Sequence, residues 1–205
     1  MSSHSNKMNI DPKMIIGNWT HGWALDQHTL RSTSGGSDSS MHPEFDTERT
    51  ELGEALYKLK YRADMAQVEP IVRTAADFIR NRSELSDIKA VLAVPPSDTR
   101  RSFQPVQALA AGIGALLRLP APDDYLLKAR ATLPLKSVTG KHSRRLELDG
   151  AFAVADQRFA DTHVLLFDDL FRSGETLKAV TAVLLFQGNA TMVSVVTATS
   201  TRSHR

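Results

Sequence analysis

The stretch of sequence that decides the fold is Val164-Leu165-Leu166-Phe167-Asp168-Asp169-Leu170-Phe171-Arg172-Ser173-Gly174-Glu175-Thr176-Leu177. Its first four residues are large and apolar, which predicts a strand buried on both faces, as in a parallel sheet. Two carboxylates follow, and then a turn in which Ser173 and Gly174 can cap the next helix. Such a turn exposes free backbone N–H groups at a helix N-terminus, which is a site for anions. Because open α/β sheets bind ligands at the carboxyl ends of their strands, the pattern favours a phosphorylated sugar as the ligand.

The segments before and after this stretch alternate between strand and helix patterns. We expect helices over residues 50–61, from about Pro70 to 81, over 105–117 and over 175–186. We expect strands over residues 88–95, 125–129, 151–154, 164–170 and 190–198. Strands that alternate with helices imply a parallel sheet. The sequence therefore predicts an α/β domain whose central parallel sheet is flanked by helices.

The first 47 residues are expected to form a small N-terminal extension, or hood, on a domain that spans residues 48–205. Residues 17–25 are expected to form a small strand pair, and the Ser- and Gly-rich residues 32–40 a loop. Trp19 and Trp23 are either a stacking platform for a nucleobase or anchors that hold a short segment on the core. We favour the anchors, since this is the commoner use of such residues.

Composition limits the functional classes. The chain has 205 residues, 41% of them hydrophobic and 23% charged, which suits one well-buried core. A net charge of +2 is too small to indicate general binding to nucleic acid or membranes. The absence of cysteine excludes disulfides, thiolate zinc sites and a cysteine nucleophile. No apolar run approaches the ~18 residues of a membrane span, and the first residues lack the apolar core of a secretory signal. We expect a cytoplasmic protein with no membrane partner.

Two basic segments are further candidates for ligand binding. After the strand at 88–95, Pro95 and Pro96 stop strand pairing and stiffen a loop that carries Arg100 and Arg101. Guanidinium groups suit a diphosphate, although a solvated loop would show the same residues. Residues 127–145 are also basic and contain many turn formers. This segment is expected to be a flexible loop that closes over a polyanion, that binds nucleic-acid phosphates, or that is merely solvated.

The stretch from residue 164 resembles the diphosphate-sugar motif of type I phosphoribosyltransferases. That motif has four hydrophobic residues, two acids, two apolar residues and a hydroxyl-rich Gly loop ending in Thr. The acid pair, Ser173, Gly174 and Thr176 match it, whereas Arg172 departs from it, since the family usually has a small hydroxyl residue there.

Further segments resemble the competence-protein-F branch of that family. They are Leu59-Lys60-Tyr61, Val94-Pro95, Arg101-Ser102-Phe103-Gln104-Pro105, the group Arg130, Thr132 and Pro134, and the group Arg145, Ala151, Phe152 and Val154. The chain lacks the four-cysteine zinc module that many relatives carry at their N-terminus.

The resemblance implies transfer of phosphoribose from 5-phosphoribosyl 1-diphosphate (PRPP), with Mg²⁺, to a nucleobase or amine acceptor, by a homodimer. It implies that Asp168 and Asp169 hold the ribose hydroxyls and, through waters, Mg²⁺, and that Arg144 and Arg145 assist catalysis. It implies a 5′-phosphate loop of Phe171, Arg172, Ser173, Gly174, Glu175 and Thr176. It implies that diphosphate binds at Pro95, Pro96, Ser97, Arg100, Arg101 and Lys136. The alternative function is a regulatory protein that binds PRPP without turnover, linked to the uptake or processing of nucleic acid.

Overall fold

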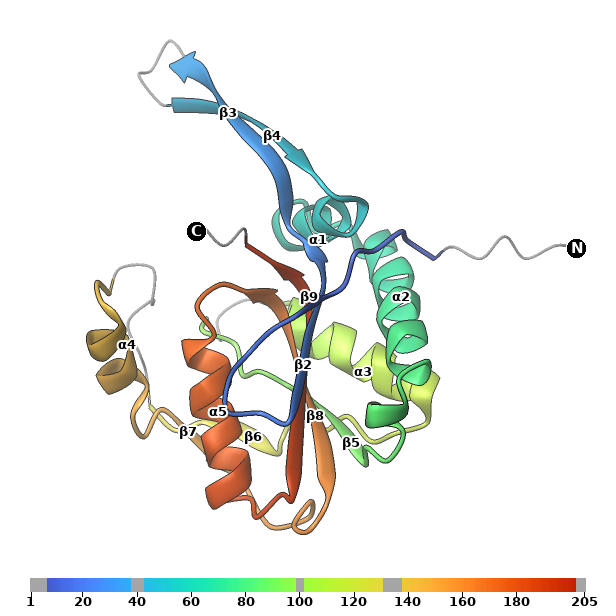
Figure 1. Cartoon of the computed structure of the whole chain (residues 1–205), viewed down its shortest axis with the longest axis vertical. Coiled ribbons are helices and arrows are strands. Elements are labelled where there is room, and N and C mark those ends of the chain that lie inside the picture. The colour runs from blue at the N-terminus through green and yellow to red at the C-terminus, as the bar shows by residue number, and fades with distance from the viewer. Residues whose placement is uncertain (1–6, 38–42, 99–101, 131–137, 202–205) are drawn as a thin grey trace, which may run out of the picture.

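The structure is a computed structural model that describes residues 7–37, 43–98, 102–130 and 138–201. A five-stranded sheet runs through its centre in the order β1-β2-β9-β8-β5 (Figure 1). Its strands are β1 (Lys13–Met14), β2 (His21–Gln27), β5 (Ala90–Ala93), β8 (His163–Phe171) and β9 (Met192–Ser200). All neighbours pair in parallel except β1, which runs antiparallel to β2. The predicted α/β fold with a central parallel sheet is therefore confirmed.

Strand β8 lies between two parallel partners, as its apolar sequence predicts. Residues 164–167 have no exposed surface, because helices cover both faces of the sheet. The register pairs Phe167 with Val196 of β9, and Ala93 of β5 also pairs with Phe167. Since β5 ends at Ala93 while β8 runs on to Phe171, the last residues of β8 extend past the end of β5.

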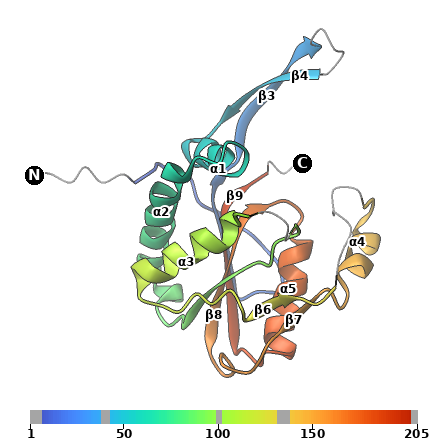
Figure 2. The same cartoon turned by 180° about the vertical axis from the view of Figure 1, so that it is seen from behind.

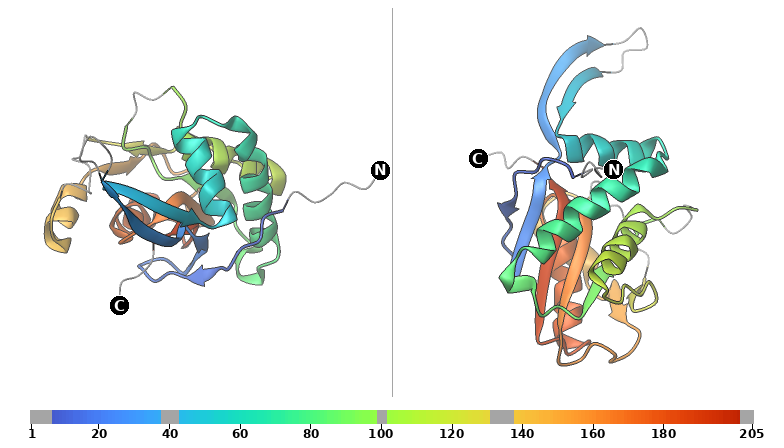
Figure 3. Two further views of the ribbon diagram at one scale, coloured as in Figure 1. Left: turned by 90° about the horizontal axis from the view of Figure 1, so that it is seen from above. Right: turned by 90° about the vertical axis from the view of Figure 1, so that its right-hand side faces the viewer.

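Helices pack on the two faces of the sheet (Figures 2 and 3). One face is covered by α1 (Glu51–Tyr61), α2 (Val68–Arg80) and α3 (Pro105–Leu117), and the other by α5 (Glu175–Phe186). Short 3₁₀ turns at Met65–Gln67 and Ser83–Leu85 flank α2. Thr50 caps α1, since its hydroxyl oxygen accepts a hydrogen bond of 3.0 Å from the Gly53 amide. None of the described helices is long and apolar enough to cross a membrane.

The N-terminal region differs from the expected strand pair and loop. Strand β2 joins the central sheet by pairing with β9, and its antiparallel partner β1 lies before residue 17. The expected loop at residues 32–40 is wrong over residues 32–37, since β3 (Thr29–Ser37) pairs with β4 (Pro43–Arg49) in a hairpin that projects from the body (Figure 1). The hairpin pairing satisfies the backbone of this polar segment, and two register shifts accommodate its irregular sequence. Whether residues 1–47 act as a hood stays a prediction.

The basic segment expected to be a flexible loop contains a helix instead over part of its length. Strands β6 (Leu126–Lys128) and β7 (Phe152–Val154) pair with each other outside the central sheet, and α4 (Lys141–Leu148) lies between them. Arg130 donates hydrogen bonds to the carbonyl oxygens of Glu147 at 2.7 Å and Asp149 at 2.8 Å. These bonds satisfy carbonyl groups at the end of α4, so the helix is held against the strand pair. Residues 131–137 lie outside the described part of the chain.

Candidate functional site

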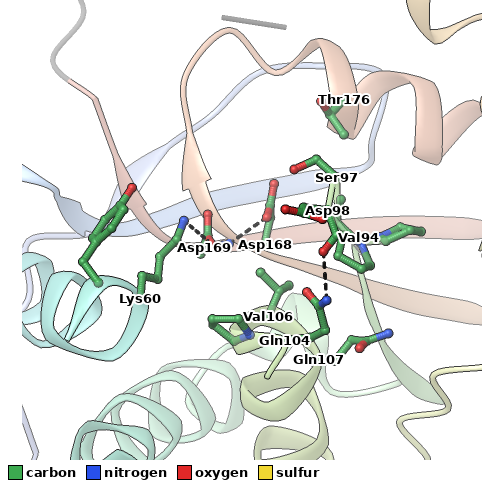
Figure 4. Close-up of a pocket in the computed structure, with 14 residues that line it drawn as sticks. Lys60, Val94, Ser97, Asp98, Gln104, Val106, Gln107, Asp168, Asp169 and Thr176 are labelled. Carbon is green, nitrogen blue, oxygen red and sulfur yellow. Dashed lines mark hydrogen bonds and ion pairs between the residues drawn. The ribbon is translucent and has the colours of Figure 1, made fainter. Parts of the chain in front are cut away.

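Two adjacent carboxyl groups, Asp168 and Asp169, lie near the C-terminal end of β8. Because successive strand residues point to opposite faces, each acid meets a different part of the protein. Asp169 meets α1, where its Oδ2 lies 2.6 Å from Nζ of Lys60 (Figure 4). Both side chains of this ion pair are largely buried, with 14% of Asp169 and 20% of Lys60 exposed. Asp168 Oδ1 accepts a 2.8 Å hydrogen bond from the Asp169 backbone amide, which fixes its orientation.

The surroundings of Asp168 disfavour its charged form. The residue is half-buried and lies next to a second acid in the chain. Burial is the main cause that raises the pKa of Asp168, the charge of Asp169 raises it further, and the ammonium of Lys60 offsets part of this effect. Burial and the neighbouring charge of Asp169 together disfavour a state in which both carboxyls are ionised. A cation, or a ligand that donates hydrogen bonds, would stabilise the ionised form of Asp168.

The turn after β8 leads into the N-terminus of α5. Gly174 is the N-cap of α5, with φ +74° and ψ 3°, and no side chain caps the helix. The prediction that Ser173 and Gly174 form the turn is confirmed, but capping by the Ser173 side chain is wrong. The Gly174 carbonyl accepts the first backbone bond of the helix, from Lys178 at 2.9 Å. The amides before Lys178 in the first turn of α5 have no carbonyl within the helix to bind, which leaves them for an anion.

A cavity of about 580 Å³ lies at this turn. We call it the turn cavity, and it is lined by residues 170–177 together with Asp168 and Arg144. Arg144 comes from the first turn of α4, where its Nε donates a 2.9 Å hydrogen bond to the Val138 carbonyl. The cavity therefore combines the start of α5 with two arginines, Arg144 and Arg172, whose positive charge suits a phosphate.

The turn is supported from beneath by the N-terminal segment. The Trp19 ring meets the Phe171 ring edge-on with 6.3 Å between centroids, and its Nε1 donates to the Ile15 carbonyl at 3.0 Å. Trp19 and Trp23 are only 8% and 7% exposed. The interpretation of both tryptophans as anchors is therefore confirmed, and their burial excludes a stacking platform for a nucleobase. Gly174 packs against Phe171, because a Cβ built at Gly174 would lie 2.8 Å from Phe171 Cε2.

A second cavity of about 280 Å³ lies beside the acid pair (Figure 4). We call it the loop cavity, and it is lined by residues 94–98 and 104–107, Lys60, Tyr61, Asp168, Asp169 and Thr176. Gln104 Nε2 donates a 2.9 Å hydrogen bond to the Asp98 carbonyl, which ties the loop after β5 to the start of α3. Asp168 and Thr176 line both cavities, so one ligand can reach from the helix N-terminus to the loop after β5.

The structure brings together part of the set of residues predicted for the site. Residues 171–176 and Arg144 meet Asp168 at the turn cavity, and Pro95, Pro96 and Ser97 meet Asp168 and Asp169 at the loop cavity. Arg145 lies in α4, but the position of its side chain is not described. Arg100, Arg101 and Lys136 lie outside the described residues, so their predicted contact with a diphosphate stays a prediction.

Sequence reasoning missed the role of Lys60. The sequence does contain a pattern that indicates this position. Lys60 lies four residues after the buried Leu56 and therefore on the side of α1 that faces the core. It also missed His28, whose Nδ1 lies 3.2 Å from Thr199 Oγ1, while that hydroxyl donates to the Asp169 carbonyl at 3.1 Å. Burial lowers the pKa of His28, and the nearby positive charge of Arg49 lowers it further. No sequence pattern marks this residue, because its neighbours come from distant strands.

Comparison with known proteins shows the fold. No protein-family model and no curated protein matches the chain. Adenine phosphoribosyltransferase from Trypanosoma brucei, solved with AMP, pyrophosphate and ribose 5-phosphate, matches with a TM-score of 0.50 and 14% identity over 92% of this chain and 74% of its own. This chain has the type I phosphoribosyltransferase fold. Glutamine PRPP amidotransferase from B. subtilis is more distant, with a TM-score of 0.48 and 15% identity over 75% of this chain and 34% of its own.

Proposed function

We propose that this protein is a phosphoribosyltransferase that uses PRPP and Mg²⁺ to transfer phosphoribose to a nitrogenous acceptor. The observation that carries the proposal is the position of Asp168, at the junction of two cavities. One cavity contains an uncapped helix N-terminus and the other the loop after β5. A ligand with a phosphate at one end, vicinal hydroxyls in the middle and a second anionic group at the other end fits this order.

The turn cavity is the proposed site of the 5′-phosphate. The first amides of α5 lack partners within the helix, and a phosphate there would also interact favourably with the helix dipole. Arg172 and Arg144 supply positive charge to the same cavity. Thr176 lines both cavities, so its hydroxyl could donate a hydrogen bond to the phosphate or to the ribose.

The reaction would take place between Asp168 and the loop after β5. A nitrogen lone pair of the acceptor attacks the anomeric carbon, the bond from that carbon to diphosphate breaks, and diphosphate leaves with the electron pair. Asp168 would accept hydrogen bonds from the ribose hydroxyls and stabilise positive charge that develops on the ring. Residues 95–97 would face the departing diphosphate, and Arg100, Arg101 and Lys136 are proposed to neutralise it.

The acid pair is chemically suited to Mg²⁺. The described residues contain no group of three side chains that could hold a metal by themselves. Mg²⁺ commonly binds one or two carboxylates together with phosphate oxygens of the substrate and waters. Burial is the main cause of the raised pKa of Asp168, and a divalent cation bound with the diphosphate would offset this cost of burying its charge. Bound Mg²⁺ would neutralise charge on the diphosphate, while the protein residues hold and orient the sugar.

A regulatory protein that binds PRPP without turnover is the second candidate function. The specific observation in its favour is the Lys60–Asp169 ion pair, which engages one of the two acids that the reaction would use. Membership of the competence-protein-F branch, a homodimer and a cytoplasmic location stay predictions. Lys60 and Tyr61 of the segment that resembles this branch do line the loop cavity.

Diphosphate release distinguishes the two functions. Purified protein is incubated with PRPP, Mg²⁺ and a panel of purines, pyrimidines and amines, and the release of diphosphate is followed for each acceptor. Release that depends on one acceptor class supports an enzyme, whereas calorimetric binding of PRPP without release supports a regulatory protein. The test variant is Asp168→Asn. Its matched control is Asp161→Asn, at an exposed position with φ 57°, which asparagine tolerates well. Absence of PRPP binding by the wild-type protein would refute both functions.

A further inference from the structure

Lys60 stands out among the residues around the acid pair. Among the described residues that line the loop cavity it is the one lysine or arginine, and three aspartates line the same cavity. Lys60 belongs to the last turn of α1, which precedes β8 in the chain by a hundred residues. Its ammonium nevertheless lies within 2.6 Å of Asp169.

The two acids have different surroundings, because Asp169 pairs with Lys60 while Asp168 faces the two cavities. Figure 4 shows Lys60 on the far side of Asp169, with Asp168 pointing toward the side where Ser97 and Thr176 lie. Asp169 is therefore engaged by a protein cation, and Asp168 is the acid that both cavities share. Both side chains are mostly buried, so water screens the attraction between the two charges only weakly.

We propose that Lys60 is a positioning residue that acts as the fixed countercation of the acid pair, so that ribose hydroxyls bind at Asp168 and no metal ion is needed beside Asp169. This inference rests on the proposed function of the site as a phosphoribosyl site. The ligand would then need positive charge at two places, each met by a different cation. Lys60 supplies the charge beside the acids that bind the ribose, and Mg²⁺ is needed only where a diphosphate is present.

The consequence appears when Lys60 is removed. Asp169 then loses the ammonium that lies 2.6 Å from its carboxyl, and the two neighbouring carboxylates repel each other. This repulsion would disturb Asp168, the proposed acceptor for the ribose hydroxyls, and the place beside Asp169 becomes open to a metal ion. Binding of a ligand that carries no diphosphate should then become dependent on Mg²⁺.

Ribose 5-phosphate is the probe, because it has the 5′-phosphate and the hydroxyls but lacks the diphosphate. Its affinity is measured by calorimetry in EDTA and in excess Mg²⁺ for the wild-type protein, Lys60→Met and Lys60→Arg. We expect equal affinities in both conditions for the wild type. For Lys60→Met we expect affinity in EDTA to fall by about tenfold or more, the scale of one hydrogen bond to a charged group, and to recover with Mg²⁺. Lys60→Arg keeps the charge and should bind as the wild type does.

Lys58→Met is the matched control, since Lys58 lies on the same helix and forms a weaker, exposed ion pair with Glu54 at 3.8 Å. It should not change binding in either condition. If Lys60→Met unfolds, the double variant Lys60→Met/Asp169→Asn removes both charges, so that Asp169 no longer repels Asp168, and its binding of ribose 5-phosphate should not depend on Mg²⁺.

Three results would overturn the inference. The first is wild-type binding of ribose 5-phosphate that requires Mg²⁺. The second is Lys60→Met binding that is unchanged in EDTA or does not recover with Mg²⁺, because Lys60 would then have only a structural role. The third is binding of ribose 5-phosphate by the double variant that depends on Mg²⁺. If the wild type binds neither ribose 5-phosphate nor PRPP, the proposed function is overturned together with this inference. If the wild type binds these ligands but the Lys60 variants behave otherwise than expected, only this inference is overturned.

Discussion

Replacing Gly174 with alanine tests whether the turn before α5 is a phosphate site. The substitution introduces two separate costs. A left-handed backbone costs a residue with a Cβ about 1–2 kcal/mol, and Gly174 has φ +74°. The new Cβ would also lie 2.8 Å from Phe171 Cε2, so the phenyl ring has to leave its rotamer at a cost of about 0.5–1.5 kcal/mol.

Gly150→Ala separates the two costs. Gly150 has φ +63°, but nothing lies within 4 Å of a Cβ built there. Gly150→Ala should therefore lower the free energy of unfolding only by the cost of the left-handed backbone. Because about 1 kcal/mol corresponds to about 2–4 °C in Tm for a chain of this size, Gly174→Ala should unfold a few degrees below Gly150→Ala in thermal melts. Replacing Phe171 with leucine should remove most of this difference.

The binding assay then distinguishes stability from function. A shifted turn misaligns the amides at the start of α5, and each lost hydrogen bond to a charged phosphate costs about 1.5–3 kcal/mol. Calorimetry should show ribose 5-phosphate affinity reduced on the order of tenfold to a hundredfold in Gly174→Ala, and unchanged in Gly150→Ala. Wild-type affinity in a folded Gly174→Ala protein would refute the assignment of this turn to the 5′-phosphate.

Three further predictions concern the acid pair, the core and the basic helix. Because the folded-state pKa of Asp168 is raised, the folded protein loses stability as pH rises from about 4 toward that pKa. In thermal melts with EDTA, Asp168→Asn should therefore be more stable than the wild type at neutral pH. This difference in stability should vanish at low pH. Phe167→Ala should cost about 3–5 kcal/mol in urea unfolding because Phe167 is fully buried, whereas Phe186, 82% exposed, should tolerate alanine. Arg130→Met removes the hydrogen bonds to the end of α4, so trypsin should cut within α4 faster, and an unchanged rate would contradict the role of Arg130.

The sequence predicted the central sheet because local patterns determine much of it. Residues 164–167 are all apolar, which is typical of a strand covered on both faces of a parallel sheet, and the turn at Gly174 lies within the same stretch. The β3–β4 hairpin could not be predicted in this way, since its residues are polar and its pairing follows no hydrophobic alternation. Part of the site was equally hidden. The Lys60–Asp169 contact joins residues 109 positions apart. The spacing of residues within a helix or strand predicts contacts only between near neighbours in the chain, so it could not predict this one.

The two tryptophans lie on opposite faces of the sheet, Trp23 with the cluster under α1, α2 and α3, and Trp19 with the cluster under α5. Only Trp19 contacts the turn that holds Gly174, through Phe171 and at a distance of 3.5 Å from the position of a Gly174 Cβ. The chain has just these two tryptophans. A Trp23→Phe variant would therefore emit indole fluorescence from one position, directly beneath the turn. Its emission would serve as an optical reporter of anion binding that needs no label, no substrate turnover and no knowledge of the acceptor.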